Sequence, residues 1–459
     1  MHRAGPGFPG KEIEVVAPAR TAAAAALDLV DSRRRHSDDV LNSDLVAGLE
    51  IRDRNLVTEI VLGTLRWRGW LDHILAAGID RDLEAVESRV LSLLRMSLYQ
   101  MSRMDRIPDH AIIHDAVDLA KVNLRKGAAG FVNGVLRNLA RQRPWRNPEF
   151  HRDCPLWDRV SLPRWLWQRW EDRYGTDRAC EYALSLNRAP RSAFRFAGPR
   201  AGKPTAGEVP PGRSRDDSPF VRPFYTASEI VPGACLLEVP QTGAWRDDVR
   251  FQDEASQLIP YLLDPREGSI VWDACAAPGG KAAILRENLG ESGYLIASEK
   301  LPLRAARLRT TLSRVGGAKC DLLVLDAGSP PPFRGQFDAV LADVPCSGLG
   351  TLRPNPELKW RIDPGCLPDF SRRQSAILGS VACSVRVGGL LLYATCSTEP
   401  EENEGVVEAF LGLNHGFHLV RPSAPPGISA WIDATGMFRS YPSPRIWDGF
   451  FAALMVRTS

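Results

Sequence analysis

Residues 273–281 read Asp-Ala-Cys-Ala-Ala-Pro-Gly-Gly-Lys, and this stretch decides the fold. It follows a short apolar run, 269–274, and leads into 280–289, which has the composition of a helix. Small residues and two glycines at a strand-to-helix turn let the backbone approach a bound ligand closely. The turn lacks the G-x-G-x-x-G pattern of dinucleotide-binding proteins, and Pro278 argues against that cradle. The stretch predicts a Rossmann-like sheet that binds a nucleotide-type ligand, without identifying the nucleotide.

Outward from this turn, short apolar runs alternate with helical stretches from about residue 250 to the end. Such alternation is typical of an α/β fold with a doubly wound parallel sheet, so we expect one over 250–459. The expected strands are 269–274, 294–298, 322–325, 339–342, 390–394 and 449–456. The expected helices are 280–289, 301–314, 369–386 and 401–411. Ligands of this fold bind beyond the carboxyl ends of the strands.

Acidic residues stand at the ends of the first three strands. Asp273 ends the first, Glu299 follows the second and Asp326 follows the third. An acid after the second strand can accept hydrogen bonds from both ribose hydroxyls of an adenosine, and Asp326 can reach the adenine edge. One such acid alone is more often a strand-end cap. Three in succession predict that this sheet edge binds a nucleotide.

Cysteines stand at the next two strand ends. The sequence D-V-P-C-S-G (343–348) follows the fourth strand, and A-T-C-S (394–397) ends the fifth. In a doubly wound sheet both thiols point into one crevice, beside Asp343. A thiolate that adds to C6 of cytosine makes C5 nucleophilic, and an acid at N3 assists the addition. Lys281 or a sulfonium cofactor would lower the pKa of the attacking thiol. Strand order alone leaves open which of Cys346 and Cys396 attacks.

The rest of the chain predicts further domains. Its 459 residues are too many for one ordinary domain. Residues 18–142 carry apolar positions at helical spacing and predict an all-α domain of five to seven helices. Residues 143–249 predict a linker and small RNA-binding subdomain, with one helix at 163–174. A flexible loop is expected at 198–219, where Pro and Gly are frequent.

Charge is unevenly distributed along the chain. The net charge is only +3, but residues 121–200 hold 17 Lys and Arg against seven Asp and Glu. Basic side chains gain affinity for a polyanion by displacing counterions from its phosphates, which favours an RNA partner. A solvated basic face would give the same composition. Aromatic residues interleaved with this stretch favour RNA, although they would equally anchor an amphipathic helix: Trp145, Trp157, Trp165, Trp167, Trp170 and Tyr174.

Other classes of protein are disfavoured by composition. The nine cysteines include no C-x-x-C pair and the eight histidines form no ligand-like cluster, so we expect neither a disulfide framework nor a metal site. No apolar run approaches the ~20 residues of a membrane-spanning helix. The first fifteen residues lack the apolar centre of a secretion signal. We therefore expect a cytoplasmic protein without a membrane partner.

The motifs together resemble the RNA cytosine-C5 methyltransferase family. Residues 273–281 look like its cofactor loop, 343–348 like its proline–cysteine motif and 394–397 like its threonine–cysteine motif. Segments 251–257, 350–360 and 448–451 also resemble family segments. The resemblance implies S-adenosylmethionine as cofactor, with Cys396 as the nucleophile and Cys346 needed for product release. The residues implied to contact the cofactor or the base are Cys275, Ala276, Ala277, Pro278, Gly279, Gly280, Lys281, Glu299, Asp326 and Asp343.

The helical half resembles a bacterial transcription antitermination factor, through 61–66, 107–111 and 131–138. Together the halves are similar to the bacterial members that methylate 16S ribosomal RNA, by resemblance at cytosine 967. The resemblance implies a monomer that acts on unassembled or partly assembled 16S ribosomal RNA. Glu299 stands where the family usually has Asp, and Ala282 where it usually has Thr.

Three other interpretations remain. Transfer RNA is an alternative substrate of the same chemistry. An amino-group methyltransferase would carry Asn/Asp-Pro-Pro-aromatic after the fourth strand, where this chain has Asp-Val-Pro-Cys. A non-catalytic RNA-binding or ribosome-assembly factor would share the fold, but the presence of both cysteines, Asp343 and Lys281 speaks against it.

Overall fold

Two units make up the computed structural model, Met1–Ser161 and Leu162–Ser459. It describes residues 17–190, 192–197, 207–208, 224–237, 249–333, 336–423, 425, 427–442 and 447–459. The first unit continues past the boundary that the sequence suggested at residue 142. It includes the short helical segments η2 (Pro144–Arg146), α9 (Pro148–Asp153) and α10 (Leu156–Arg159).

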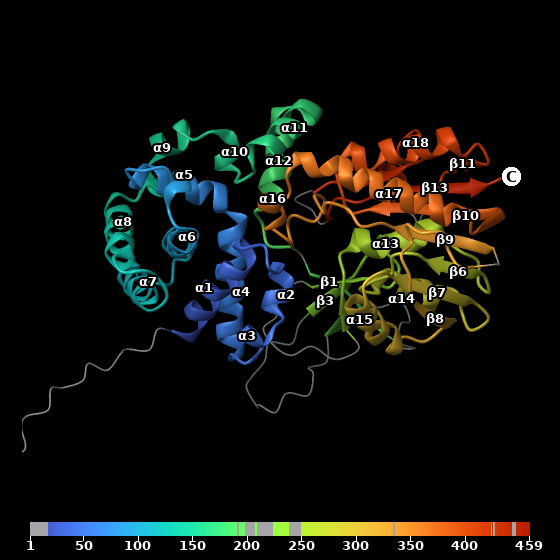
Figure 1. Ribbon diagram of the computed structural model, residues 1–459, viewed down its shortest axis with the longest axis horizontal. Helices are drawn as coiled ribbons and strands as arrows, with labels where there is room; N and C mark the ends of the chain where they lie inside the picture. The colour runs from blue at the N-terminus through green and yellow to red at the C-terminus, as the bar shows by residue number, and fades with distance from the viewer. Residues whose placement is uncertain are drawn as a thin grey trace, which may run out of the picture. The chain divides into compact units, whose positions relative to one another are not determined.

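The described part of the first unit is built from helices (Figure 1). Its centre is α6 (Ser88–Arg103), in which every residue from Val90 to Met101 is buried. The expected five to seven helices over 18–142 were too few, because α2 and α3 have five and four residues and show no periodicity. The elements over 18–142 are, in chain order, α1 (Pro18–Asp31), α2 (Ser37–Leu41), α3 (Asp44–Ala47), α4 (Ile51–Arg66), α5 (Arg68–Gly78), η1 (Leu83–Ala85), α6 (Ser88–Arg103), α7 (Asp109–Asn123) and α8 (Ala128–Gln142).

The second unit begins with two helices and a small antiparallel sheet. The helices are α11 (Arg164–Tyr174), as expected, and α12 (Thr176–Leu186), which the sequence did not indicate. Five short strands follow in the order β2-β3-β4-β1-β5. They are β1 (Ala193–Phe196), β2 (Gly207–Glu208), β3 (Phe224–Ala227), β4 (Cys235–Leu237) and β5 (Val249–Phe251). Strands of two to four residues are too short for an alternating pattern, so this sheet was not predicted. The loop expected at 198–219 lies outside the described residues, apart from β2.

An eight-stranded sheet forms the body of the second unit, in the order β11-β13-β10-β9-β6-β7-β8 with β12 paired to β13. Strands β6 to β10 pair in parallel, and β13 runs antiparallel to β10. The strands are β6 (Ile270–Asp273), β7 (Tyr294–Glu299), β8 (Lys319–Val324), β9 (Phe337–Asp343), β10 (Val385–Thr395), β11 (Phe417–Leu419), β12 (Phe438–Arg439) and β13 (Phe451–Arg457). This confirms the predicted α/β fold. Since β7 and β9 lie on opposite sides of β6, the direction of winding reverses there and opens a crevice beyond the strand ends.

Helices cover both faces of this sheet (Figure 1). Alternate side chains of a strand point to opposite faces: Val271 packs with α13, α14 and α15, whereas Trp272 packs with α17 and α18. Burial on both sides explains why these strands appear in the sequence as continuous apolar runs. The helical elements are α13 (Glu254–Leu263), α14 (Gly280–Asn288), α15 (Pro302–Ser313), α16 (Leu358–Arg361), η3 (Pro364–Cys366), α17 (Leu367–Ala382), η4 (Pro400–Glu402), α18 (Glu404–Leu413) and η5 (Ser429–Trp431). None of the described helices combines the length and apolar character that crossing a bilayer requires.

Candidate active site

The turn after β6 forms the floor of the crevice. Gly279, just before α14, has φ +112°, and a Cβ there would lie 2.9 Å from Thr311 and 3.0 Å from Leu308. Only glycine fits this backbone and this space. The Thr311 hydroxyl donates to the Pro278 carbonyl at 2.8 Å and fixes the turn against α15. A cavity of about 330 Å³ opens above it, lined by Arg250, Phe251, Gln252, Ser256, Ala276, Ala277, Pro278, Gly280, Lys281, Thr311 and Asp343.

Asp273 is the last residue of β6 and is 1% exposed. No hydrogen bond of normal geometry reaches either of its carboxylate oxygens among the described residues, although the Cys275 N–H faces the group and acts to lower its pKa. Burial, followed by the charge of Asp343, raises the pKa of Asp273 to about 8. A buried acid without a well-formed hydrogen bond is costly, so its position just before the turn that lines the cavity favours a ligand that supplies a donor. Asp273 is one of the three strand-end acids noted in the sequence, but the family resemblance did not assign it a contact with the cofactor or the base.

Glu299 and Asp326 occupy different environments. Glu299 ends β7, is 5% exposed, and lies 3.6 Å from the guanidinium of Arg304. Arg304 also donates to the carbonyl of Ala277 at 3.1 Å, which links Glu299 to the turn after β6. Asp326 lies two residues beyond β8 and is half-exposed. A hydrogen bond from Lys300, 2.7 Å away, and one from a backbone N–H lower the pKa of Asp326. Glu299 is therefore joined to the predicted cofactor loop, whereas Asp326 is held at the surface.

Lys281 and Asp343 form an ion pair at the centre of the crevice, with Nζ 2.7 Å from Oδ2. Lys281 comes from the first turn of α14 and Asp343 from the end of β9. Burial opposes the charge on Lys281, but Asp343 outweighs burial and the pKa of Lys281 is raised. The ammonium also lies 5.3 Å from the centre of the Phe450 ring. The pair places a fixed carboxylate beside the cavity.

The two thiols predicted from the sequence, Cys346 and Cys396, lie next to each other. Strands β9 and β10 are parallel neighbours, and Asp343 pairs with Ala394, so the strands end at the same level. Cys346 and Cys396 then approach until their sulfur atoms are 3.1 Å apart. The Cys396 amide N–H also points to the Cys346 sulfur, at 3.3 Å. A hydrogen bond with Cys396 and burial raise the pKa of Cys346 well above its usual value.

The loop after Cys346 is folded tightly over the thiols. The Gly350 N–H donates to the Cys396 carbonyl at 2.9 Å, and the Gly449 N–H donates to the Gly350 carbonyl at 2.7 Å. A Cβ on Gly350 would lie 1.9 Å from the Gly449 oxygen, so no side chain fits there. The segments 350–360 and 448–451, noted in the sequence, are brought together at the thiol pair.

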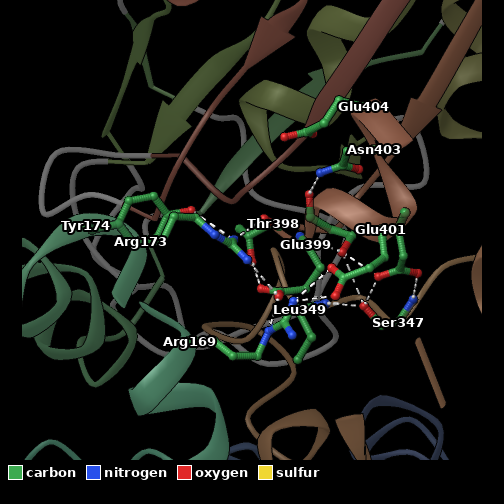
Figure 2. A network of polar contacts seen from close by, with 12 residues as sticks. Arg169, Arg173, Tyr174, Ser347, Leu349, Thr398, Glu399, Glu401, Asn403 and Glu404 are labelled. Carbon is green, nitrogen blue, oxygen red and sulfur yellow. Dashed lines mark hydrogen bonds and ion pairs between the residues drawn. The ribbon is translucent and has the colours of Figure 1, made fainter. Parts of the chain in front are cut away.

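The segment after Cys396 is tied to α11 by ion pairs (Figure 2). Glu399 is fully buried and lies 2.7 Å from Arg169 and 3.2 Å from Arg173. Both carboxylate oxygens of Glu401 also accept hydrogen bonds from Arg169. Arg173 donates to the Thr398 carbonyl at 2.9 Å. Both arginines belong to the basic stretch 121–200, for which the sequence favoured an RNA partner. They are neutralised within the unit instead.

The aromatic residues of α11 also differ from the RNA interpretation. Trp167 and Trp170 are 2% and 1% exposed and anchor the helix in the core. For these two residues the preference for RNA was wrong, and the alternative of an amphipathic helix holds. Within the described ranges, no group of three or more His, Cys, Asp and Glu could hold a metal ion.

Comparison with known proteins identifies relatives of both halves. A family profile described as "16S rRNA methyltransferase RsmB/F" matches residues 260–456, and one for the NusB family matches 17–141. The chain is 32% identical to "Probable ribosomal RNA small subunit methyltransferase B" of Bacillus subtilis (strain 168), over 95% of this chain and 98% of that protein. It is 32% identical to "Ribosomal RNA small subunit methyltransferase B" of Pseudomonas syringae pv. tomato, over 86% and 87% of the two chains. The crystal structure of the protein PH0851 superposes with a TM-score of 0.77 at 25% identity, covering 96% of this chain and 99% of that one.

Proposed function

Because the chain belongs to the 16S rRNA methyltransferase RsmB/F family, we propose that it methylates C5 of a cytosine in 16S ribosomal RNA through a covalent adduct with Cys396. The chain is a methyltransferase and its cofactor is S-adenosylmethionine. The observation that carries the proposal is the pair of thiols, 3.1 Å apart, at neighbouring strand ends of the crevice that contains Lys281 and Asp343. An enzyme that methylated an exocyclic amine would need neither thiol.

The residues around the turn after β6 fit the cofactor. The cavity lined by this turn would hold it, and the buried carboxylate of Asp273 would accept hydrogen bonds from its ammonium group. Glu299 would accept from the ribose hydroxyls, and Asp326, two residues beyond β8, would accept from the adenine. When bound, the cofactor supplies an electrophilic methyl group on a sulfonium. The chain's own residues must therefore make C5 of the base nucleophilic.

The thiols would do this in two steps. Cys396, as the thiolate, forms a bond to C6. The electron pair of the C5–C6 double bond forms a C4–C5 double bond, the pair of the C4–N3 double bond moves to N3, and N3 takes a proton. The ion-paired carboxylate of Asp343 stabilises a proton on N3, which favours the addition. After methylation, a base must take the C5 proton, and the electron pair of the C5–H bond re-forms the C5–C6 double bond as the bond to Cys396 breaks. Cys346, beside Cys396, would assist that release.

The substrate is proposed from the family. The relatives carry names that refer to small-subunit ribosomal RNA, and cytosine 967 is the expected target. A stacked base hides C6, so the target must be unstacked, which favours free or partly assembled RNA. We expect a monomer acting in the cytoplasm, where this RNA is found.

Methylation of purified RNA tests the proposal. The protein would be incubated with labelled S-adenosylmethionine and with 16S ribosomal RNA or transfer RNA, and 5-methylcytosine would be mapped by mass spectrometry. The proposal requires 5-methylcytosine in the ribosomal RNA. The modified base in transfer RNA only would move the substrate to that class. Methyl groups on exocyclic amines would reject the thiol chemistry, and the absence of any transfer would favour a non-catalytic RNA-binding factor.

A further inference from the structure

Glu402 is a buried acid that the proposed chemistry does not use. It ends η4, six residues after Cys396, and is 0% exposed. A buried carboxylate is tolerated when its oxygens accept hydrogen bonds. Glu402 accepts four. Oε1 accepts from the Ser347 N–H at 2.8 Å and from Gln374 at 3.0 Å, and Oε2 accepts from the hydroxyls of Ser347 and Ser397, both at 2.5 Å.

The serine donors are the residues that follow the two thiols. Ser347 comes directly after Cys346 on the β9 loop, and Ser397 directly after Cys396 on the β10 loop. One carboxylate therefore bridges the two loops. The serine oxygens lie 3.3 Å apart and the sulfur atoms 3.1 Å apart. Because the peptide link between neighbouring residues is rigid, fixing the serines restricts the distance between the thiols.

Glu402 is itself held from several directions. The hydroxyl of Tyr393, in β10, donates to the Glu402 carbonyl at 2.5 Å. Gln374, from α17, donates both to the carboxylate and to the Pro345 carbonyl at 3.1 Å, directly before Cys346. The acid is thus part of a fixed support beneath the thiols and not a mobile side chain.

We infer that Glu402 is a positioning residue that sets the distance between Cys346 and Cys396 through Ser347 and Ser397. The inference rests on the proposed function, in which both thiols act on one base. The charge of Glu402 also favours the protonated form of Cys346. It raises the pKa of that thiol, together with the hydrogen bond to Cys396 and burial, which contribute more. A protonated Cys346 can donate its S–H to Cys396.

The rate at which Cys346 and Cys396 are oxidised to a disulfide reports how readily their sulfur atoms meet, and it does not depend on methyl transfer. Diamide accepts two electrons and two protons from a pair of thiols, which become a disulfide, and the reaction requires that the sulfurs meet. The cross-linked peptide joining Cys346 to Cys396 would be quantified by mass spectrometry over time. With Glu402→Leu, we expect this peptide to form at least about tenfold more slowly. We expect kcat to fall by roughly 10²-fold, the cost of a displacement of about 1 Å, with the KM for S-adenosylmethionine unchanged.

A conservative variant separates positioning from loss of structure. In Glu402→Gln, the amide oxygen still accepts from Ser347 and Gln374, and the amide N–H groups donate to the two hydroxyls. We expect cross-linking within about threefold of the native rate. Glu401→Gln is the matched control, because Glu401 is in the same turn but binds Arg169 and not the thiol loops. It should cross-link at the native rate.

The outcomes distinguish this inference from the proposed function. Native cross-linking in folded Glu402→Leu overturns the positioning role, whatever the protein methylates. If Glu402→Leu does not fold, the double variant Ser347→Ala/Ser397→Ala serves instead, because it removes two of the four donors to Glu402. The positioning role then requires that its rate of cross-linking between Cys346 and Cys396 be lower than the native rate. A native protein that makes no 5-methylcytosine would reject the proposed function and leave the cross-linking result intact.

Discussion

The sulfur atoms of Cys346 and Cys396 lie 3.1 Å apart, although the residues are fifty positions apart in the chain. Both side chains are half-buried and both follow parallel strands that end at the same level. A base that bonds to one sulfur therefore has the other beside it. In the proposed mechanism, addition and release would therefore take place at one location. This geometry alone does not distinguish the attacking thiol from the releasing one. The variants Cys396→Ala and Cys346→Ala would distinguish them.

Replacing the proposed nucleophile should abolish methyl transfer and leave cofactor binding intact. Without the Cys396 sulfur no covalent adduct forms and C5 is not activated, so we expect Cys396→Ala to lose activity by roughly 10⁴-fold or more. Transfer of labelled methyl groups to RNA measures the loss, and calorimetry measures the affinity for S-adenosylmethionine. Cys383→Ala, at an exposed position, is the control and should keep full activity. Full activity in Cys396→Ala would reject the mechanism.

Replacing the proposed releasing thiol should instead trap the intermediate. In Cys346→Ala, the base still adds to Cys396, but the step that breaks the bond is slowed. We expect a protein–RNA adduct that survives denaturing electrophoresis. The double variant Cys346→Ala/Cys396→Ala should form none. An adduct in Cys396→Ala and none in Cys346→Ala would exchange the two roles.

Much of the fold and of the site could be predicted from the sequence. Strands β6 to β10 are buried on both faces, so each appears as an apolar run, and their order along the chain fixes which ends meet. Asp343, Cys346 and Cys396 could be predicted for this reason, since they end or closely follow a strand, and Lys281 could be predicted because it lies in the first turn of the helix after β6. The identification of the family is confirmed by relatives that match nearly the whole chain.

Contacts between residues that are far apart in the sequence could not be predicted. Glu399 and Glu402 lie in an acidic run, Glu-Pro-Glu-Glu-Asn-Glu at 399–404, which reads as a solvated helix start. Glu399 and Glu402 are nevertheless fully buried, because their partners come from α11, α17 and the β9 loop. A buried acid looks the same in sequence as an exposed one. Only the position of these glutamates shortly after the Thr-Cys-Ser motif could have drawn attention to them.

Burial should decide the value of two ion pairs of equal length. Lys281–Asp343 and Lys300–Asp326 both measure 2.7 Å, but the side chains are 13% and 23% exposed in the first pair and 65% and 41% in the second. Lys281→Met leaves a carboxylate buried near Asp273, and we expect a loss of about 3 kcal/mol in the free energy of unfolding. Lys300→Met should cost less than about 1 kcal/mol. Urea unfolding measures both, and equal losses would contradict the role of burial.

The raised pKa of Asp273 should make stability depend on pH. The folded chain keeps this proton up to about pH 8, whereas an unfolded Asp loses it near 3.8. Its stabilising contribution is therefore complete below about pH 4 and is lost as the pH rises through the folded value. Asp273→Asn does not titrate. In urea unfolding without cofactor, the stability of the native chain relative to Asp273→Asn should fall steadily between about pH 5 and about pH 8. A constant difference would mean that the pKa is not raised.

The Glu399 carboxylate should contribute more to stability than its neighbour Glu401, although both bind Arg169 (Figure 2). Glu399 is fully buried and shared by two arginines, whereas the side chain of Glu401 is 41% exposed. Glu399→Gln leaves Arg169 and Arg173 facing a neutral amide, so we expect the free energy of unfolding to fall by about 3 kcal/mol. For the matched change Glu401→Gln we expect less than about 1 kcal/mol, because water screens the exposed pair. A double-mutant cycle with Arg169→Gln should then give a larger coupling to Glu399 than to Glu401. Equal couplings would show that burial adds nothing to this network.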